Sequence, residues 1–214
     1  KNGDYQLAEY IMALLSDANT FVPQMNEEDI ESLRKVSLLN LESLPLPEPI
    51  SKDVIGIVNA VRRNIGVNKF LFEGAPGTGK TETTKQITRL LERELYIVDF
   101  ETIVDSKLGQ TSKNIASLFK EINSFSKPNR VVILFDEIDA IALNRLDTND
   151  LREMGRATSA ILKGIDSLND EVVLIATTNL FDVFDKALIR RFDAVINFNN
   201  YSQDDLLDIS IVLM

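Results

Sequence analysis

Five short runs of apolar residues divide most of this chain into regular segments, and longer amphipathic stretches separate them. The runs are residues 69–72, 95–98, 131–135, 172–176 and 194–198. Continuous apolar character, rather than alternation, is typical of strands that are buried on both faces of a parallel sheet. Strands that alternate with helices predict an open, doubly wound α/β domain with five parallel strands and helices on both faces. Ligands of such domains bind at the carboxyl ends of the strands, so the residues that follow each run are the first candidates for function.

A glycine-rich loop follows the first apolar run and precedes a helical stretch. It consists of Gly74, Ala75, Pro76, Gly77, Thr78, Gly79, Lys80 and Thr81. This order matches the P-loop pattern, in which glycines allow successive backbone N–H groups to point at phosphate oxygens. Lys80 is expected to reach the β- and γ-phosphates, and the Thr81 hydroxyl to bind Mg²⁺. The alternative, a glycine-rich turn with a chance lysine, does not explain the strand before the loop and the helix after it.

Two acidic residues, Asp136 and Glu137, follow the third apolar run directly. A carboxylate at the end of a buried strand is unfavourable unless it serves an ion. We therefore predict that Asp136 is a Mg²⁺ partner and that Glu137 is the base that orients and activates an attacking water molecule. We expect Asp139 to cap the next helix rather than to take part in catalysis.

Polar residues also flank the last two runs. Asn179 follows the fourth run, where its side chain would hold the lytic water or contact the γ-phosphate; an ordinary turn asparagine is the alternative. Arg190 and Arg191 precede the fifth run. They are either surface charges or arginine fingers, which neutralise the charge that develops on a transferred phosphoryl group.

Composition excludes several other chemistries, because the 214 residues include neither histidine nor cysteine. Catalytic triads with histidine, zinc fingers and thiolate nucleophiles are therefore ruled out. The net charge of −10 argues against a nucleic-acid partner. The longest apolar run has five residues and no targeting segment is visible, so we expect a cytoplasmic chain without a membrane segment.

The first 49 residues differ in character, with nine acids and three bases. Two helical patterns are expected, over residues 7–18 and 26–41. The prolines within residues 44–49 predict an extended linker that cannot be helical. We interpret residues 1–49 as a small helical segment and a linker; the helices either pack on the main domain or form an independent partner-binding module.

The stretch from about Ile50 to Phe198 resembles an ATPase module of the AAA family, within the AAA+ superfamily of P-loop NTPases. The resemblance rests on three motifs in order: the Walker A loop GAPGTGKT, the Walker B strand ILFDEID, and a second region of homology from TTN to RRFD. It implies Mg²⁺-dependent ATP hydrolysis in a hexameric ring, with Arg190 and Arg191 acting on the neighbouring subunit's nucleotide. The residues that would act within the same subunit are Lys80, Thr81, Asp136, Glu137 and Asn179.

Three features depart from the family pattern. The two arginines are adjacent, whereas many relatives separate them, so the order of their roles stays open. Residues 106–111 resemble the pore loop of protein-remodelling members, but Lys107 stands where an aromatic residue usually grips the substrate, and Leu108 follows it. A plain surface loop leading into a helix at Thr111 is the alternative. The family's C-terminal helical lid is expected to be missing, with residues 201–214 at most its first helix.

The resemblance thus predicts an ATPase domain over residues 50–200 that belongs to a ring-shaped homo-oligomer and remodels or unfolds a protein substrate. The alternative is an ATP-gated scaffold or assembly factor with little turnover. The non-aromatic pore loop favours this alternative, whereas Glu137 and the arginine pair count against it. A DNA-loading ATPase is disfavoured by the acidity of the chain.

Overall fold

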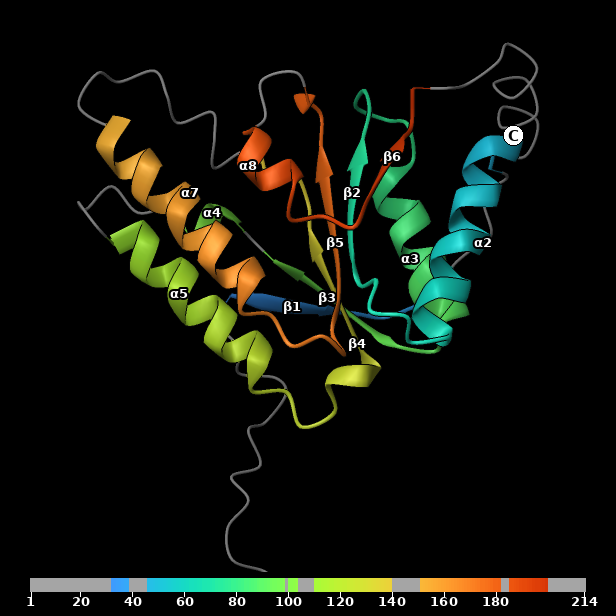
Figure 1. Ribbon diagram of the computed structural model, residues 1–214, viewed down its shortest axis with the longest axis horizontal. Coiled ribbons are helices and arrows are strands. Elements are labelled where there is room, and N and C mark those ends of the chain that lie inside the picture. The colour runs from blue at the N-terminus through green and yellow to red at the C-terminus, as the bar shows by residue number, and fades with distance from the viewer. Residues whose placement is uncertain are drawn as a thin grey trace, which may run out of the picture. The chain divides into compact units, whose positions relative to one another are not determined.

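The computed structural model describes residues 32–38, 46–98, 100–103, 110–139, 151–181 and 185–199. These residues form a six-stranded sheet with the strand order β1-β3-β4-β5-β2-β6. The strands are β1 (Leu33–Val36), β2 (Lys69–Glu73), β3 (Glu94–Val98), β4 (Val131–Phe135), β5 (Val173–Thr178) and β6 (Ala194–Asn197). Strands β2 to β6 pair in parallel, which confirms the predicted parallel sheet (Figure 1).

Each parallel strand coincides with one of the five predicted apolar runs to within two residues at either end. The apolar character follows from position, because β4 and β5 lie inside the sheet and all their residues are buried. The strand order also places the carboxyl ends of β4, β5 and β2 next to one another. Polar residues that follow these three strands therefore meet at one edge of the sheet.

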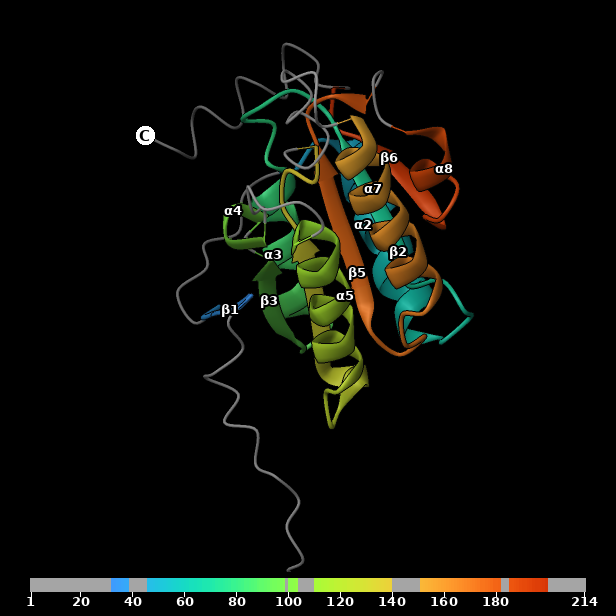
Figure 2. The ribbon, with the colours of Figure 1, turned by 90° about the vertical axis from the view of Figure 1, so that its left-hand side faces the viewer.

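Helices cover both faces of the sheet (Figures 1 and 2). On one face lie α2 (Glu48–Arg62) and α3 (Lys80–Leu90), and on the other lie α5 (Gln110–Asn123) and α7 (Leu151–Asp166). The shorter helical segments are α4 (Phe100–Ile103), η1 (Pro128–Arg130) and α8 (Lys186–Ile189). Among the described residues, no helix is both long enough and apolar enough to cross a membrane.

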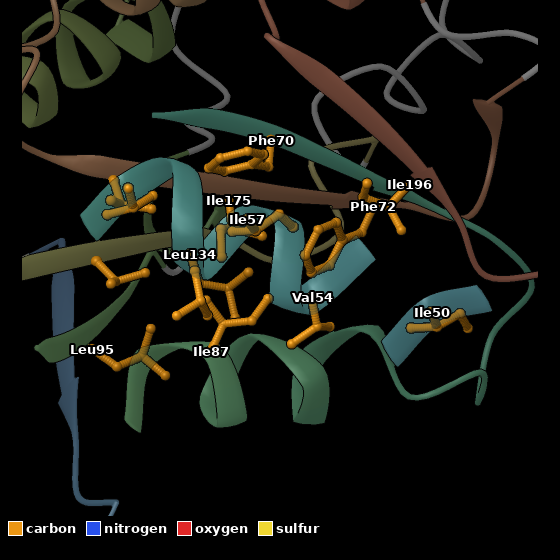
Figure 3. Packing of buried hydrophobic residues seen from close by; sticks show 14 of the residues in the cluster. Ile50, Val54, Ile57, Phe70, Phe72, Ile87, Leu95, Leu134, Ile175 and Ile196 are labelled. Atoms are coloured by element: carbon orange, nitrogen blue, oxygen red, sulfur yellow. The ribbon is translucent and has the colours of Figure 1, made fainter. Parts of the chain in front are cut away.

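Apolar side chains fill the space between the sheet and each helical layer. Figure 3 shows Ile57 of α2, Ile87 of α3 and Phe72 of β2 in the core on one face. On the other face the Phe119 ring of α5 meets the Phe135 ring of β4 edge-on, with 5.7 Å between the ring centroids. Burial on both faces thus fixes the strands whose ends carry the candidate site.

The predicted helix over residues 26–41 is wrong where the structure describes it, because residues 33–36 form β1. This strand pairs antiparallel with β3, so that Leu33 lies opposite Val98. Leu33 is buried, and the ammonium of Lys35 lies 3.0 Å from a carboxylate oxygen of Glu94. Without β1, the backbone of β3 would have no partner on this side among the described strands, and pairing across the sheet overrides the helical pattern.

The prediction that the proline-rich stretch is wholly non-helical is also wrong. Helix α2 begins at Glu48, with Pro47 as the residue before it and Pro49 in its first turn. Proline is tolerated there because the first N–H groups of a helix have no partner within the helix. The N–H of Ser51 donates to the Pro47 oxygen at 2.8 Å and closes the first turn.

Other predictions fall on segments outside the described residues. These are the helix over residues 7–18, the pore-loop positions 106–109 and the lid segment 201–214. The helix expected at Thr111 is confirmed, since α5 begins at Gln110.

Candidate active site

The glycine-rich loop joins the end of β2 to the start of α3. Gly77 and Gly79 have φ angles of 79° and 86°, in the left-handed region that favours glycine. The N–H of Gly74 donates to the Thr178 oxygen at 3.3 Å, and a Cβ atom at Gly74 would lie only 2.8 Å from the Cβ of Phe198. The loop therefore curls tightly between the ends of β5 and β6, and it ends at a helix N-terminus, where N–H groups favour an anion.

Lys80 is the first residue of α3, and only 6% of it is exposed. Its Nζ donates to the backbone oxygens of Gly74 at 2.7 Å and Ala75 at 2.9 Å, and to Oδ1 of Asn179 at 2.8 Å. Burial lowers the pKa of Lys80, while the carboxylates that follow β4 oppose this shift. The ammonium group is thus held inside the loop and beside the end of β5.

Thr81 and Asp136 lie side by side at the mouth of the loop. The Thr81 hydroxyl lies 3.0 Å from Oδ1 and 3.1 Å from Oδ2 of Asp136. A hydroxyl and a carboxylate are the oxygen donors that Mg²⁺ prefers, and this ion commonly binds through one carboxylate together with substrate phosphates. The arrangement therefore fits Mg²⁺ bound together with a phosphorylated substrate.

Asn179 connects Lys80 with Glu137. Its Oδ1 accepts from Lys80, and its Nδ2 donates to Oε1 of Glu137 at 3.3 Å. Glu137 itself is exposed and has a φ angle of 51°, which is uncommon for a residue other than glycine. The structure therefore brings together the three residues that the motifs placed far apart in the sequence.

Asp139 also belongs to this cluster, through a contact with Asn179. It is 4% exposed, and its Oδ1 accepts from the backbone N–H of Asn179 at 3.3 Å. The carboxylate therefore supports the backbone that carries Asn179. The helix that Asp139 is expected to cap lies outside the described residues.

Two residues of the site escaped the sequence analysis. The Thr177 hydroxyl accepts from the N–H of Glu137 at 2.8 Å and donates to Oδ1 of Asp136 at 2.7 Å. Thr177 follows the fourth apolar run directly and opens the TTN motif, but nothing in the sequence shows what its hydroxyl contacts. The other is Asn199, whose Oδ1 accepts from the N–H of Ala75 at 2.8 Å; the two residues are 124 positions apart, and no local pattern links them.

The two arginines lie at the end of α8 and differ in their surroundings. Arg191 is held within its own chain, because its Nε lies 3.2 Å from Oδ1 of Asp166 and its Nη1 donates to the Ala187 oxygen at 3.0 Å. Arg190 is exposed, and its side chain makes no hydrogen bond or ion pair within the described part of the chain. Neither arginine forms a described hydrogen bond with the residues around Lys80.

The fold and this cluster define a P-loop nucleoside-triphosphatase domain. A family model described as "ATPase family associated with various cellular activities (AAA)" matches residues 70–200. The chain therefore belongs to this family.

Individual relatives agree with this assignment. The chain is 36% identical over 132 residues to the uncharacterized AAA family ATPase y4kL of Sinorhizobium fredii, an alignment that covers 62% of the chain and 39% of the relative. It is 34% identical over 179 residues to the proteasome-activating nucleotidase of Saccharolobus islandicus, with coverages of 79% and 41%. It is 32% identical over 183 residues to the peroxisomal ATPase PEX6 of Arabidopsis thaliana, with coverages of 82% and 18%. The chain thus spans less than half the length of each of these relatives.

A solved structure supports the fold. The crystal structure of the FIGL-1 AAA domain in complex with ADP aligns with a TM-score of 0.62 at 20% identity, over 86% of this chain and 63% of the other.

Proposed function

We propose that this chain is the Mg²⁺-dependent, ATP-hydrolysing module of a ring-shaped ATPase that remodels or unfolds a protein substrate. The observation that carries the proposal is the hydrogen-bonded cluster of Lys80, Asn179 and Glu137. Glu137 and Asn179 follow the neighbouring strands β4 and β5, and Lys80 begins α3 at the end of the glycine-rich loop. A base, a cation and an orienting amide in one place are what phosphoryl transfer to water requires.

Each residue of the cluster has a role in this proposal. The N–H groups of the loop and the Lys80 ammonium hold the phosphates. Thr81 and Asp136 hold Mg²⁺, which neutralises phosphate charge when it is bound. Glu137, whose carboxylate is exposed, accepts a proton from the attacking water. Asn179 joins Glu137 to Lys80 through two hydrogen bonds, and its proposed role is to contact the γ-phosphate.

The arginines support a ring, in which they act on the nucleotide of the neighbouring subunit. Arg190 is the better candidate for this contact, because it is exposed and its side chain is not engaged within the described part of its own chain. Arg191 is already paired with Asp166 of α7, so it would position the turn that presents Arg190. A hexamer, as the family resemblance implies, is part of this proposal.

The substrate class is also part of the proposal. A relative named as a proteasome-activating nucleotidase favours a role that involves proteins. The homo-oligomer is proposed from the family resemblance. We propose no nucleic-acid partner, because the chain is acidic overall. A cytoplasmic location remains a prediction.

The Glu137→Gln variant tests the catalytic assignment. The amide keeps the shape of the side chain but cannot accept a proton, so we expect ATP binding to persist while turnover falls by about 100-fold or more. The measurement is phosphate release by the full-length protein, together with binding of a fluorescent ATP analogue. Undiminished hydrolysis by this variant would overturn the assignment.

The ATP-gated scaffold is the second candidate, and the sequence of the pore-loop segment favours it, since Lys107 stands at the position of the usual aromatic residue. An ATPase assay with an unfolded protein separates the two candidates. A remodeller is stimulated by the unfolded protein, whereas a scaffold is not.

A further inference from the structure

Thr177 occupies a special position between the two acidic residues of the site. It lies in β5 and is fully buried. A hydroxyl has one hydrogen and two lone pairs, and Thr177 uses both capacities at once. It accepts from the N–H of Glu137 at 2.8 Å and donates to Oδ1 of Asp136 at 2.7 Å.

The backbone at Glu137 is the part of the site that most needs such support. The parallel ladder between β4 and β5 ends at Phe135, so strand pairing no longer fixes the residues that follow. Glu137 has a φ angle of 51°, a conformation that costs free energy for a residue with a side chain and persists only where its surroundings hold it. The next N–H, that of Ile138, donates to the backbone oxygen of Thr177 at 3.0 Å. Residue 177 therefore binds two successive N–H groups of this turn.

The same hydroxyl also fixes the direction of the Asp136 carboxylate. Oδ1 of Asp136 accepts from Thr177 on one side and from Thr81 on the other, at 2.7 Å and 3.0 Å. With Oδ1 held between two hydroxyls, the carboxylate has little freedom to rotate. The orientation of a ligating carboxylate commonly depends on hydrogen bonds of this kind.

We infer that Thr177 is a positioning residue for hydrolysis, which holds the Asp136 carboxylate toward Thr81 and the Glu137 turn toward Asn179 through a single hydroxyl. This inference rests on the proposed function, in which Asp136 binds Mg²⁺ and Glu137 is the base. It differs from a purely structural role, because a β-branched residue that only fills space in β5 would be replaced equally well by valine.

The Thr177→Val variant tests the hydroxyl at nearly constant volume. It leaves the N–H of Glu137 without its acceptor and Asp136 without one donor. We expect kcat to fall by about 10- to 100-fold, the range found when the hydrogen-bond partners of metal ligands are removed. The affinity for nucleotide without Mg²⁺ should stay within about threefold of the wild type, because the loop and Lys80 are untouched. The Mg²⁺ concentration needed for half-maximal binding of a fluorescent ATP analogue should rise by about tenfold.

Two further variants separate the hydroxyl from packing and folding. Thr177→Ser keeps the hydroxyl and should restore kcat and the Mg²⁺ requirement to within about threefold of the wild type. Thr88→Val is the matched control: Thr88 is also fully buried, but its hydroxyl donates to the Thr84 oxygen at 2.7 Å inside α3. This control should leave the Mg²⁺ requirement unchanged. If Thr177→Val does not fold, the same measurements on Thr177→Ala decide the question.

The inference is overturned if a folded Thr177→Val or Thr177→Ala protein keeps both kcat and the Mg²⁺ requirement of the wild type. It is also overturned if Thr177→Ser is as slow as Thr177→Val, or if Thr88→Val raises the Mg²⁺ requirement equally. The Glu137→Gln variant, measured alongside, distinguishes the two proposals. If it hydrolyses ATP normally, the proposed function fails; if it is inactive and Thr177→Val is fully active, only the role of Thr177 fails.

Discussion

Gly164 allows α7 to lie close against α5, and its replacement by alanine gives a sharp test of the packing. A Cβ atom at this position would fall within 3.0 Å of three atoms of the Phe119 ring, a separation that real Cβ atoms essentially never show. The Phe119 ring cannot shift away easily, because Phe119 is 3% exposed and its ring also packs against Phe135. Gly155 lies on the same helix, and among the described residues no atom outside its own stretch of helix comes within 4 Å of the position where its Cβ would lie.

The size of the effect follows from two opposing terms. Overpacking of a tight core costs about 1–3 kcal/mol, and a ring held on both sides places Gly164→Ala near the upper end. Alanine gains about 1 kcal/mol over glycine inside a helix, so the free energy of unfolding should fall by about 2 kcal/mol. For a chain of this size, the melting temperature should drop by about 4–8 °C. The matched Gly155→Ala variant has only the helical gain and should be more stable by about 0.5–1 kcal/mol.

Chemical denaturation and thermal melting of the two variants decide the matter. The reasoning is refuted if Gly164→Ala is as stable as the wild type, or if both variants shift in the same direction by the same amount. Phe119→Leu provides a second check, because a smaller side chain makes room for the new methyl group. Gly164→Ala should therefore cost less in the Phe119→Leu background than in the wild type.

Three further predictions concern the site. Arg190→Ala should lower kcat of the assembled protein by about 1,000-fold or more without weakening nucleotide binding to isolated subunits. Asp166→Asn should lower kcat by less, because it acts only through Arg191. Steady-state kinetics of the two variants check which of them has the larger effect on kcat. Asp136→Asn should abolish the stimulation of nucleotide binding by Mg²⁺, and equal stimulation in wild type and variant would contradict the metal assignment. Burial lowers the pKa of Lys80 below its ordinary value of 10.5, so the unfolded chain holds this proton more tightly than the folded one. The nucleotide-free protein should therefore gain stability as the pH rises from the lowered pKa toward 10.5. Denaturation across this pH range should show the gain in the wild type and not in Lys80→Met.

The parallel sheet and the phosphate-binding loop could be predicted because their signals are local. A strand that is buried on both faces needs apolar residues at every position, and β4 contains nothing else. Likewise, the spacing from Gly74 to Thr81 is required by the curl of one loop. These features are visible in the residues themselves, without knowledge of what lies next to them in the fold.

The features that escaped prediction depend on distant partners. The antiparallel strand β1 forms by pairing with the backbone of β3 on the side away from β4. Its four residues are too few to give a periodic signal in the sequence. Thr177 reads as one more β-branched strand residue until the end of β4 is known to lie beside it. Asn199 becomes part of the site only because β6 ends next to the glycine-rich loop.

The pairing of β1 with β3 has a practical consequence for dissecting the protein. A fragment that begins at residue 46, just before α2, would contain every nucleotide-binding motif and would look like a complete catalytic domain. Removal of β1 would nevertheless bare the N–H and C=O groups along β3, whose residues Leu95 and Val98 are buried. A bare apolar strand of this kind recruits a second copy of the chain and promotes aggregation. Soluble expression of the isolated ATPase domain should therefore require a start before Leu33.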